Sequence, residues 1–363
     1  MIKIKEKKVL LEPRDLFPSS SKFEILGVFN PGAVRLANGD IVLYVRIWEK
    51  LIKTEDKKYY YAPRMIGRKT FKVVIDKFKK ESAKSKSNLD IIFKDGTKRI
   101  TFISYFKRVI LDRSGFNIKL IDKNPSFYGL YNDGEFGVED PRITKIEKGY
   151  IMTYVSLSKE QNISTSLAIS RDCKNWKRRG IIFGEQDKDV VIFPRKVKEK
   201  YVAFDRPESN FQFSLPHIWI AYSSNLESWG DLKPVGCVYK KGGICTRNGA
   251  GPPPIKTDKG WLLIYHAVEE KEENNKRVSE YIVGAALFNL KNPEKIISAT
   301  GKPLLLPLKE EVMVFDAKRI IFPTGAIFDE NKKDLLIFSG ESDKITTVSK
   351  VSLRDILKAL KRI

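Results

Sequence analysis

The chain repeats one short pattern, in which a turn residue or a charge precedes an apolar run that ends in an aromatic and a polar residue. Gly149 to Ser156 is one copy and Gly260 to His266 is another. The apolar runs begin at residues 41, 150, 201, 261 and 335, at intervals of 109, 51, 60 and 74 residues. Short strands at such spacing, with turn signals between them, favour radial repetition of small sheets, which leaves few exposed edges. The sequence therefore predicts an all-β fold, a five-bladed β-propeller.

Two segments fall outside this repeat, although one domain over residues 1–363 accounts for the whole chain. The first interval exceeds a blade of about 40 to 50 residues, so the lysine-rich residues 71–118 are predicted to be an insertion between the first two blades. Within it, residues 71–88 could form a helix or an exposed loop, and residues 91–111 alternate as in a hairpin. Residues 352–363 carry apolar side chains at helical spacing behind Ser352, a suitable N-cap, and predict a C-terminal helix.

Composition narrows the classes of function. The 67 lysines and arginines exceed the 45 acidic residues and leave a net charge of +22, which would attract nucleic acid, an anionic surface or a small anionic substrate. The lysines are spread rather than gathered with aromatics on one face, which disfavours nucleic-acid binding. No apolar run approaches the roughly 18 to 20 residues of a membrane span, and the basic N-terminus lacks the apolar stretch of a signal peptide. Three dispersed cysteines and two distant histidines give neither a disulfide framework nor a metal-ligand spacing. We therefore expect a cytoplasmic protein without membrane, nucleic-acid or metal partners; homo-oligomers are not excluded.

The segment from Gly137 to Ile143 concentrates the chemistry. Glu139 and Asp140 stop against a proline, and Arg142 follows. Proline suits the first residue of a strand, so the two carboxylates are expected where a loop enters a strand, a place from which side chains reach a cleft on rigid support. In an extended segment Asp140 and Arg142 would share one face and Glu139 the other. Taken alone, the segment is more typical of a salt-bridged turn.

The polar residues that end the repeated runs are candidates for the centre of a ring of blades, because equivalent strands converge on one axis. They are Arg46, Ser156, Arg206, His266 and Glu341.

Further segments occur in the same order as in one known family: Asn30-Pro31-Gly32, Phe193-Pro194-Arg195-Lys196, Arg206-Pro207, Gly249 to Pro254, Trp261 to His266 and Phe322-Pro323-Thr324-Gly325. With Gly137 to Ile143, they resemble the motifs of glycoside hydrolase family 130, the mannoside phosphorylases and related mannosidases. The resemblance covers roughly residues 25–345. It implies an enzyme that cleaves β-mannosidic bonds, most directly by inverting phosphorolysis of β-manno-oligosaccharides to α-mannose 1-phosphate. Phosphate would be the co-substrate, with no other cofactor.

Such a reaction needs an acid that protonates the leaving oxygen, and a nucleophile. The resemblance makes Asp140 the general acid, with its proton relayed through a sugar hydroxyl. Arg142 on the same face would lower the pKa of Asp140, which an acid has to avoid unless burial offsets it or Arg142 turns toward another anion. For phosphate, the resemblance and the residue types point to Lys188, Lys196, Arg247 and His266. The glycines after Arg247 would let the backbone approach a ligand closely. For the sugar, family-like contexts point to Asn30, Arg46, Arg64, Arg68, Glu139, Arg142, Arg206, Tyr265 and Asp343.

Two positions depart from the family's phosphorylase pattern and keep alternatives open. Asp187-Lys188-Asp189 stands where an Asn-Arg or Arg-Asn pair is usual, and Asp205 stands where a histidine precedes Arg206-Pro207. Glu269 and Glu270 could also supply a base for water. Phosphorolysis is favoured, an inverting β-mannosidase that uses water is the first alternative, and a non-catalytic carbohydrate-binding propeller is the second.

Overall fold

The computed structural model describes residues 2–68, 70–208, 213–238, 245–273, 276–307 and 318–362. Within these residues most of the chain is strand, with one α-helix, so the predicted all-β class is confirmed. That helix is far too short to cross a membrane, and the described residues contain no helix that is longer.

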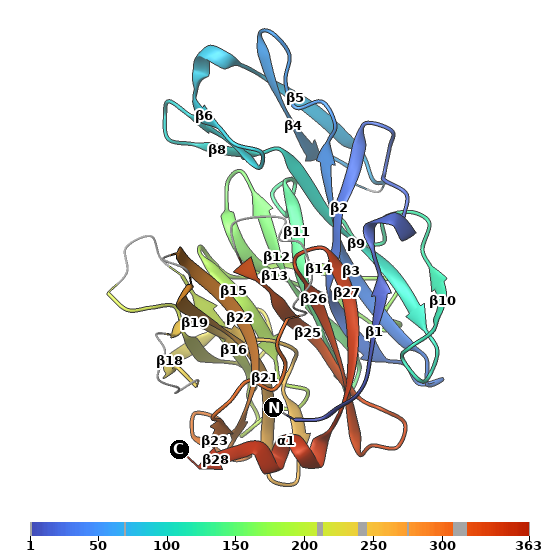
Figure 1. Ribbon diagram of the computed structural model, residues 1–363, viewed down its shortest axis with the longest axis vertical. Helices are drawn as coiled ribbons and strands as arrows, with labels where there is room; N and C mark the ends of the chain where they lie inside the picture. The colour runs from blue at the N-terminus through green and yellow to red at the C-terminus, as the bar shows by residue number, and fades with distance from the viewer. Residues whose placement is uncertain are drawn as a thin grey trace.

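Five larger sheets make up the body of the molecule (Figure 1). In the second and third sheets the strands follow one another directly along the chain. The first sheet omits several intervening strands, the fourth also includes the last strand of the described chain, and the fifth combines an N-terminal strand with three C-terminal ones. The first sheet contains β2 (Phe23–Arg35), β3 (Ile41–Leu51), β9 (Phe102–Leu111) and β10 (Ile118–Ile121); the second β11 (Gly137–Ile146), β12 (Gly149–Ser158), β13 (Asn162–Ser170) and β14 (Lys177–Phe183); the third β15 (Asp187–Ile192), β16 (Tyr201–Pro207), β17 (Ile218–Ser223) and β18 (Gly230–Gly236). The fourth contains β19 (Cys245–Ala250), β20 (Ile255–Thr257), β21 (Gly260–Glu273), β22 (Lys276–Phe288), β23 (Ile296–Thr300), β24 (Lys318–Arg319) and β28 (Leu360–Arg362); the fifth β25 (Ile321–Phe328), β26 (Asp334–Glu341), β27 (Ile345–Ser352) and β1 (Ile4–Leu11).

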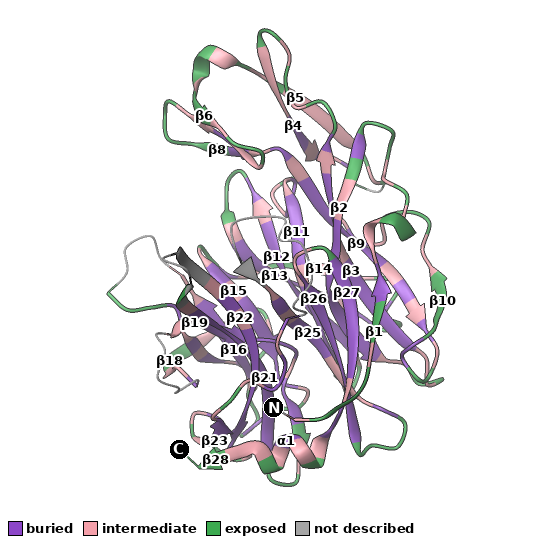
Figure 2. Cartoon of the chain, viewed as in Figure 1, coloured by how far each residue is buried: buried purple, intermediate pink, exposed green. Residues whose placement is uncertain are grey.

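The hydrophobic core is divided into five clusters, and each lies between two sheets that follow one another in order. Ala203 and Ala221 of the third sheet meet Leu167 of the second, for example, and a further cluster joins the fifth sheet to the first through Phe338 and Val45. The remaining three clusters join the first sheet to the second, the third to the fourth and the fourth to the fifth. The apolar runs of the repeated pattern supply these residues, because their strands are buried on both faces (Figure 2).

Each larger sheet has one edge strand that we call its leading strand: β2, β11, β15, β19 or β25. The leading strands of different sheets also contact one another. β2 contacts both β25 and β11, β11 contacts β15, and β15 contacts β19. At the C-terminal ends of these strands, a cavity of about 580 Å³ is lined by residues from all five sheets or the turns beside them: Ala33 to Leu36, Ile143 to Lys145, Pro194, Pro253 to Lys256, and Ala326 to Glu330. The opposite ends of the same strands carry the polar residues described below.

The lysine-rich insertion differs from its prediction. Two small sheets, one of β4 (Tyr59–Met65) and β5 (Val73–Lys79) and one of β6 (Ala83–Lys86), β7 (Asp90–Phe93) and β8 (Lys98–Ile100), project from the first sheet at the top of Figure 1. They separate β3 from β9, so the insertion lies inside the first sheet and not between the first two. Residues 102–118, expected within the insertion, instead supply β9 and the start of β10. Residues 71–88, expected to be a helix or an exposed loop, instead form strands on either side of a 3-10 turn, η2 (Lys80–Ser82), and these strands pair with β4 and β7.

The C-terminal helix α1 (Leu353–Ala359) begins where it was predicted. The Ser352 hydroxyl accepts a hydrogen bond from the backbone N–H of Asp355 at 3.2 Å, and Ile356 is fully buried. The helix is shorter than the predicted residues 352–363, because Leu360–Arg362 leave it to pair with β23. A second 3-10 turn, η1 (Pro13–Asp15), follows β1.

Candidate active site

The carboxylates of the Gly137 to Ile143 segment lie at an irregularity in β11. Its pairing with β12 shifts register between Glu139 and Arg142, and Asp140 has φ of 51°. The strand is therefore not uniformly extended there, and the predicted sharing of one face by Asp140 and Arg142 does not occur. The break turns the Asp140 carboxylate toward β2 and β3 of the first sheet.

Two side chains of the first sheet bind that carboxylate. Asn30 Nδ2 donates to Asp140 Oδ1 at 2.8 Å, and an Arg46 guanidinium nitrogen lies 3.2 Å from the same oxygen. Arg46 also pairs with Glu139, so one guanidinium spans both neighbouring carboxylates. Gly340 gives Asn30 its space, since a Cβ at position 340 would lie 2.1 Å from Asn30 Oδ1. The structure therefore brings together Asn30, Arg46, Glu139 and Asp140.

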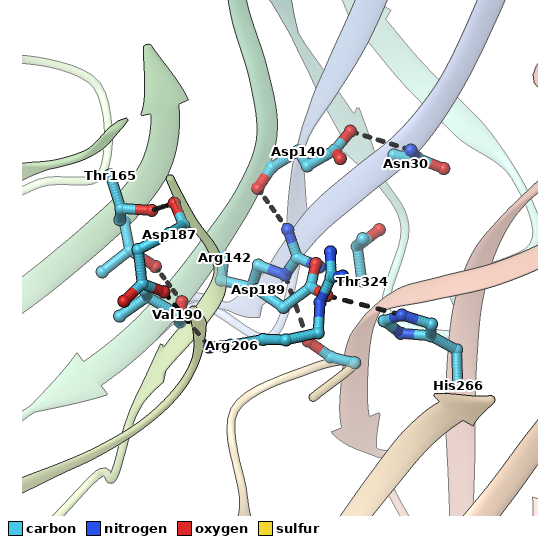
Figure 3. A network of polar contacts seen from close by, with 12 residues as sticks. Asn30, Asp140, Arg142, Thr165, Asp187, Asp189, Val190, Arg206, His266 and Thr324 are labelled. Atoms are coloured by element: carbon cyan, nitrogen blue, oxygen red, sulfur yellow. Dashed lines mark hydrogen bonds and ion pairs between the residues drawn. The ribbon is translucent and has the colours of Figure 1, made fainter. Parts of the chain in front are cut away.

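Arg142 turns away from the Asp140 carboxylate, one of the two arrangements that the sequence left open. Its guanidinium donates to the backbone oxygen of Asp140 at 2.7 Å, to that of Gly251 at 3.1 Å and to Asp189 Oδ1 at 3.1 Å (Figure 3). All of its hydrogen bonds are to protein groups, and the side chain is almost completely buried. Arg142 thus fixes the backbone beneath Asp140.

Asp189 is the centre of the cationic part of the site. Besides Arg142, its carboxylate accepts from Arg206 Nε at 2.7 Å and lies 3.4 Å from His266 Nε2. A Cβ at Gly249 would lie 2.2 Å from Asp189 Oδ2. The close approach that we expected Gly249 to make to a ligand is therefore made to this carboxylate, which the sequence argument did not assign to the site.

A second carboxylate extends the cluster. Glu208 pairs with Arg206 at 3.0 Å through one oxygen and with Arg247 through the other. Lys188, half-buried on β15 and paired in register with Arg206, lies close enough for its charge to act on Asp140. Glu208 was also missed, since an acidic residue after Arg206-Pro207 resembles an ordinary loop residue.

The charges set the protonation states. Burial alone would raise the pKa of Asp140, but Arg46, Arg142, the Asn30 hydrogen bond and Lys188 together hold it below the usual range. Burial lowers the pKa of His266 to about 3, against the attraction of Asp189, so the imidazole is neutral at pH 7. The pKa of Arg46 is raised, because Glu139, Asp140 and Asp343 outweigh its burial.

Two more carboxyl groups, Asp187 and Asp205, are buried beside Arg206. Burial and mutual repulsion raise the pKa of Asp187, and burial raises that of Asp205. The backbone N–H of Arg206 donates to Asp187 Oδ1 at 3.1 Å. Since two adjacent buried carboxylates cannot both ionise easily, the pair retains a proton near neutral pH. Asp205 was noted in the sequence only as a departure from the family pattern.

Four of the proposed ligand-binding residues lie apart from this cluster. Lys196 is exposed on the turn after β15, with its ammonium 4.6 Å from the centre of the Tyr201 ring. Tyr265 is buried in the core cluster between the third and fourth sheets, because strand alternation sends it opposite to His266. Arg64 pairs with Asp76 at 2.8 Å on the projecting hairpin, and Arg68 is exposed beyond it. Asp343, in contrast, lies near Arg46 and Tyr281, on which its charge acts.

No group of three or more metal-binding side chains occurs among the residues that the structure describes. What the site offers is one carboxyl group, Asp140, held at the edge of a dense network of arginines and carboxylates.

Comparison with known proteins places this arrangement in a family. The family model for glycoside hydrolase family 130, described as β-1,4-mannooligosaccharide phosphorylase, matches residues 108–362. A β-1,2-mannobiose phosphorylase from Listeria innocua is 30% identical over 98% of this chain and 97% of its own. A 1,2-β-oligomannan phosphorylase from Thermoanaerobacter is 32% identical over 68% of this chain and 78% of its own.

Solved structures agree. The β-1,2-mannobiose phosphorylase from Listeria innocua, in complex with β-1,2-mannobiose, superposes with a TM-score of 0.80 over 96% of both chains at 30% identity. A mannose phosphorylase from Leishmania mexicana in complex with phosphate has a TM-score of 0.58 at 12% identity and covers all of this chain and 92% of its own, which supports the fold alone. The match of the family model and the full-length relative together show that this chain belongs to glycoside hydrolase family 130, whose members cleave β-mannosides.

Proposed function

We propose that the protein is an inverting β-mannoside phosphorylase that releases α-mannose 1-phosphate from β-manno-oligosaccharides, with Asp140 as the general acid. The observation that carries this proposal is the length of the similarity. A β-1,2-mannobiose phosphorylase matches nearly the whole of both chains in sequence and in structure. A shared fold without shared site residues would say little about activity. Here the polar residues of the motifs also converge, from β2, β3, β11, β15, β16 and β21, on one cluster.

We propose that the five larger sheets are the blades of a five-bladed propeller. Support comes from the five core clusters, each between two successive sheets, and from the cavity that residues of all five sheets line. In this arrangement the leading strands surround one axis. Asp140 of β11 and the network around Asp189 of β15 then face the end of the axis opposite that cavity.

The chemistry follows from the charges. Asp140 is ionised in the free protein, yet a general acid must carry its proton in the reactive complex. An incoming phosphate beside Lys188, Arg206 and Arg247 would offset part of the cationic field that holds the pKa of Asp140 low. Binding of the nucleophile would thus favour protonation of the acid. Asp140 then passes its proton, through a sugar hydroxyl, to the leaving oxygen while a phosphate oxygen attacks the anomeric carbon from the opposite face.

One observation favours water as the nucleophile and keeps an inverting β-mannosidase as the second candidate. Arg142, Arg206 and Arg247 are already engaged by Asp189 and Glu208. The Asp187–Asp205 pair adds further acidic groups close by. An inverting hydrolase needs a second carboxylate that activates water, and this site is rich in carboxylates.

The test is incubation of the purified protein with β-1,2- and β-1,4-mannobiose, with and without inorganic phosphate. We expect α-mannose 1-phosphate only when phosphate is present, with its anomeric configuration read by NMR at early times. Free mannose released at the same rate without phosphate would establish the hydrolase instead. Binding of the mannosides without turnover in either condition would leave the non-catalytic alternative.

A further inference from the structure

A second hollow lies beside the site, between the second and third sheets. It has a volume of about 670 Å³, within the range of about 300–1,000 Å³ typical of small-molecule pockets. Its walls come from the β14–β15 connection, the end of β16, residues 213–217, and one face of β17 and β18. Apart from Asp187, Pro207 and Glu208, the residues of these walls belong neither to the family motifs nor to the acid-and-anion chemistry above.

Aromatic rings dominate the wall formed by the third sheet. Trp219 on β17 is half-buried, and the centre of the Trp229 ring, in the turn before β18, lies 5.6 Å from the centre of the Phe183 ring. The Trp229 indole N–H donates to the backbone oxygen of Leu226 at 2.9 Å, which fixes its ring. At the rim, Leu232 is 47% exposed and Phe213 is 95% exposed. Apolar groups gathered this way around a hollow indicate a binding surface.

Acidic groups stand at the inner end of this aromatic wall. Asp187 and Glu208 both line the hollow. Flat apolar rings beside carboxylates suit a sugar, whose C–H faces pack on aromatics while its hydroxyl groups donate hydrogen bonds to carboxylate oxygens.

The hollow is continuous with the site through two connections. Glu208 lines it and also binds Arg206 and Arg247. The wall at residues 213–217 is attached to β19 next to Arg247. There the His217 ring nitrogen Nδ1 lies 3.1 Å from Asn248 Oδ1, and the Asn248 backbone N–H donates to the Pro216 oxygen at 3.2 Å. A ligand in the hollow would therefore extend directly from the anion-binding side of the site.

We propose that this hollow binds the sugar units of a β-manno-oligosaccharide that lie beyond the first leaving unit, so that the enzyme selects chains longer than a disaccharide. The proposal rests on the function proposed above and specifies its substrate. Trp219 supplies the stacking surface, and Leu232 closes the outer rim. We expect a tetrasaccharide bound at Asp140 to reach these side chains and a disaccharide to end before them.

The experiment compares kcat/KM for β-mannobiose and the matching β-mannotetraose, in both linkage series, for wild type and four variants. We expect wild type to prefer the tetraose. Trp219→Ala should lower the ratio of tetraose to mannobiose kcat/KM about tenfold, the effect of losing one well-packed aromatic contact. Trp219→Phe, which keeps a ring, should recover most of this ratio. Leu232→Trp, at an exposed position where misfolding is not a concern, should obstruct the hollow and lower the ratio too. Phe17→Ala, which removes an aromatic that is 87% exposed elsewhere, is the matched control and should keep the wild-type ratio.

The outcomes separate this inference from the function on which it rests. If mannobiose is turned over but neither Trp219→Ala nor Leu232→Trp changes the ratio, the hollow is not a sugar subsite, and the proposed function stands. An equal kcat/KM of the wild type for both chain lengths would overturn the inference in the same way. No turnover of any mannoside would overturn both.

Discussion

Arg206 and Asp189 form a buried ion pair in which Nε lies 2.7 Å from Oδ2, and the two side chains are only 5% and 3% exposed. The same carboxylate pairs with Arg142, so one carboxylate contacts two buried guanidinium groups, of which only Arg206 has a second acidic partner among the described residues, Glu208. Removing one partner of a buried pair leaves the other charge uncompensated, which is far more costly than the net value of the pair.

Asp189→Asn should therefore destabilise the protein by about 3–5 kcal/mol, the range for breaking a buried pair. Urea denaturation at pH 7 measures this change in the free energy of unfolding. Asp231→Asn, which removes an exposed carboxylate that pairs with Lys233, serves as the control and should have little effect. A stability of Asp189→Asn equal to that of wild type would mean that solvent, and not Asp189, compensates the two arginines.

Asp140→Asn should abolish turnover while leaving the fold intact. The amide keeps the size of the carboxyl group and tolerates the left-handed backbone at this position, but it has no proton to donate. We expect kcat to fall by about 10²–10⁴, the usual contribution of a general acid. Asp231→Asn is again a close match, because Asp231 also has φ of 51°. Retention of more than a tenth of the activity would exclude Asp140 as the acid.

Phosphate should alter the pH dependence of the reaction. The pKa of Asp140 is held low in the free protein, and the acid works only when protonated, so the rate should fall as pH rises through that pKa. An anion bound among Lys188, Arg206 and Arg247 raises the pKa and moves this descending limb to higher pH. The measurement is the pH profile at limiting and at saturating phosphate. Superimposable limbs would show that the nucleophile and the acid do not interact electrostatically.

The Asp187–Asp205 pair should make the protein less stable at alkaline pH. The pKa of both groups is raised, so the folded protein keeps a proton that the unfolded chain has released above about pH 4. The folded state then binds more protons than the unfolded state, and stability falls as pH rises from that point through the raised pKa. Asp205→Asn replaces the shared proton with an amide donor.

Asp205→Asn should raise the free energy of unfolding by about 1–2 kcal/mol at pH 9, which corresponds to removing roughly one unit of the pKa increase. The free energy of unfolding should change little at pH 5. Urea unfolding at the two pH values gives the comparison. If wild type and variant lose stability in parallel between pH 5 and 9, the pair carries no shared proton.

The repeated apolar runs were sufficient to predict the strand-rich fold and the second strand of each large sheet, because burial on both faces leaves a continuous apolar signature. The insertion was misplaced for a related reason. Phe102 to Leu111 alternates as an isolated hairpin would, and nothing in that pattern reveals that its partner is β3, whose paired residues lie 52 to 70 positions earlier. Pairing across an intervening pair of small sheets is a property of the whole fold and not of the local sequence.

The site residues also divide into those that local motifs predict and those whose role depends on the whole fold. Asn30, Arg46, Glu139 and Asp140 were found because each lies in a recognisable motif, and the structure brings them together. Asp189 escaped, since its role depends on two arginines contributed by other strands. Tyr265 was misassigned by one step of strand alternation: His266 faces the site, and its neighbour necessarily faces the core.

The pairing of β1 with β27 has a consequence for synthesis of the protein. Residues 4–11 leave the ribosome long before residues 345–352, the strand with which they pair. Until then β1 has no sheet to join, and the cluster between the fifth and first sheets lacks Phe338 and Val348. Contacts so distant along the chain form slowly, so the nascent chain must keep an unpaired strand soluble until residues 345–352 have been made. Lys5, Lys7 and Lys8 give β1 charged faces, which would keep the unpaired strand from associating with other chains.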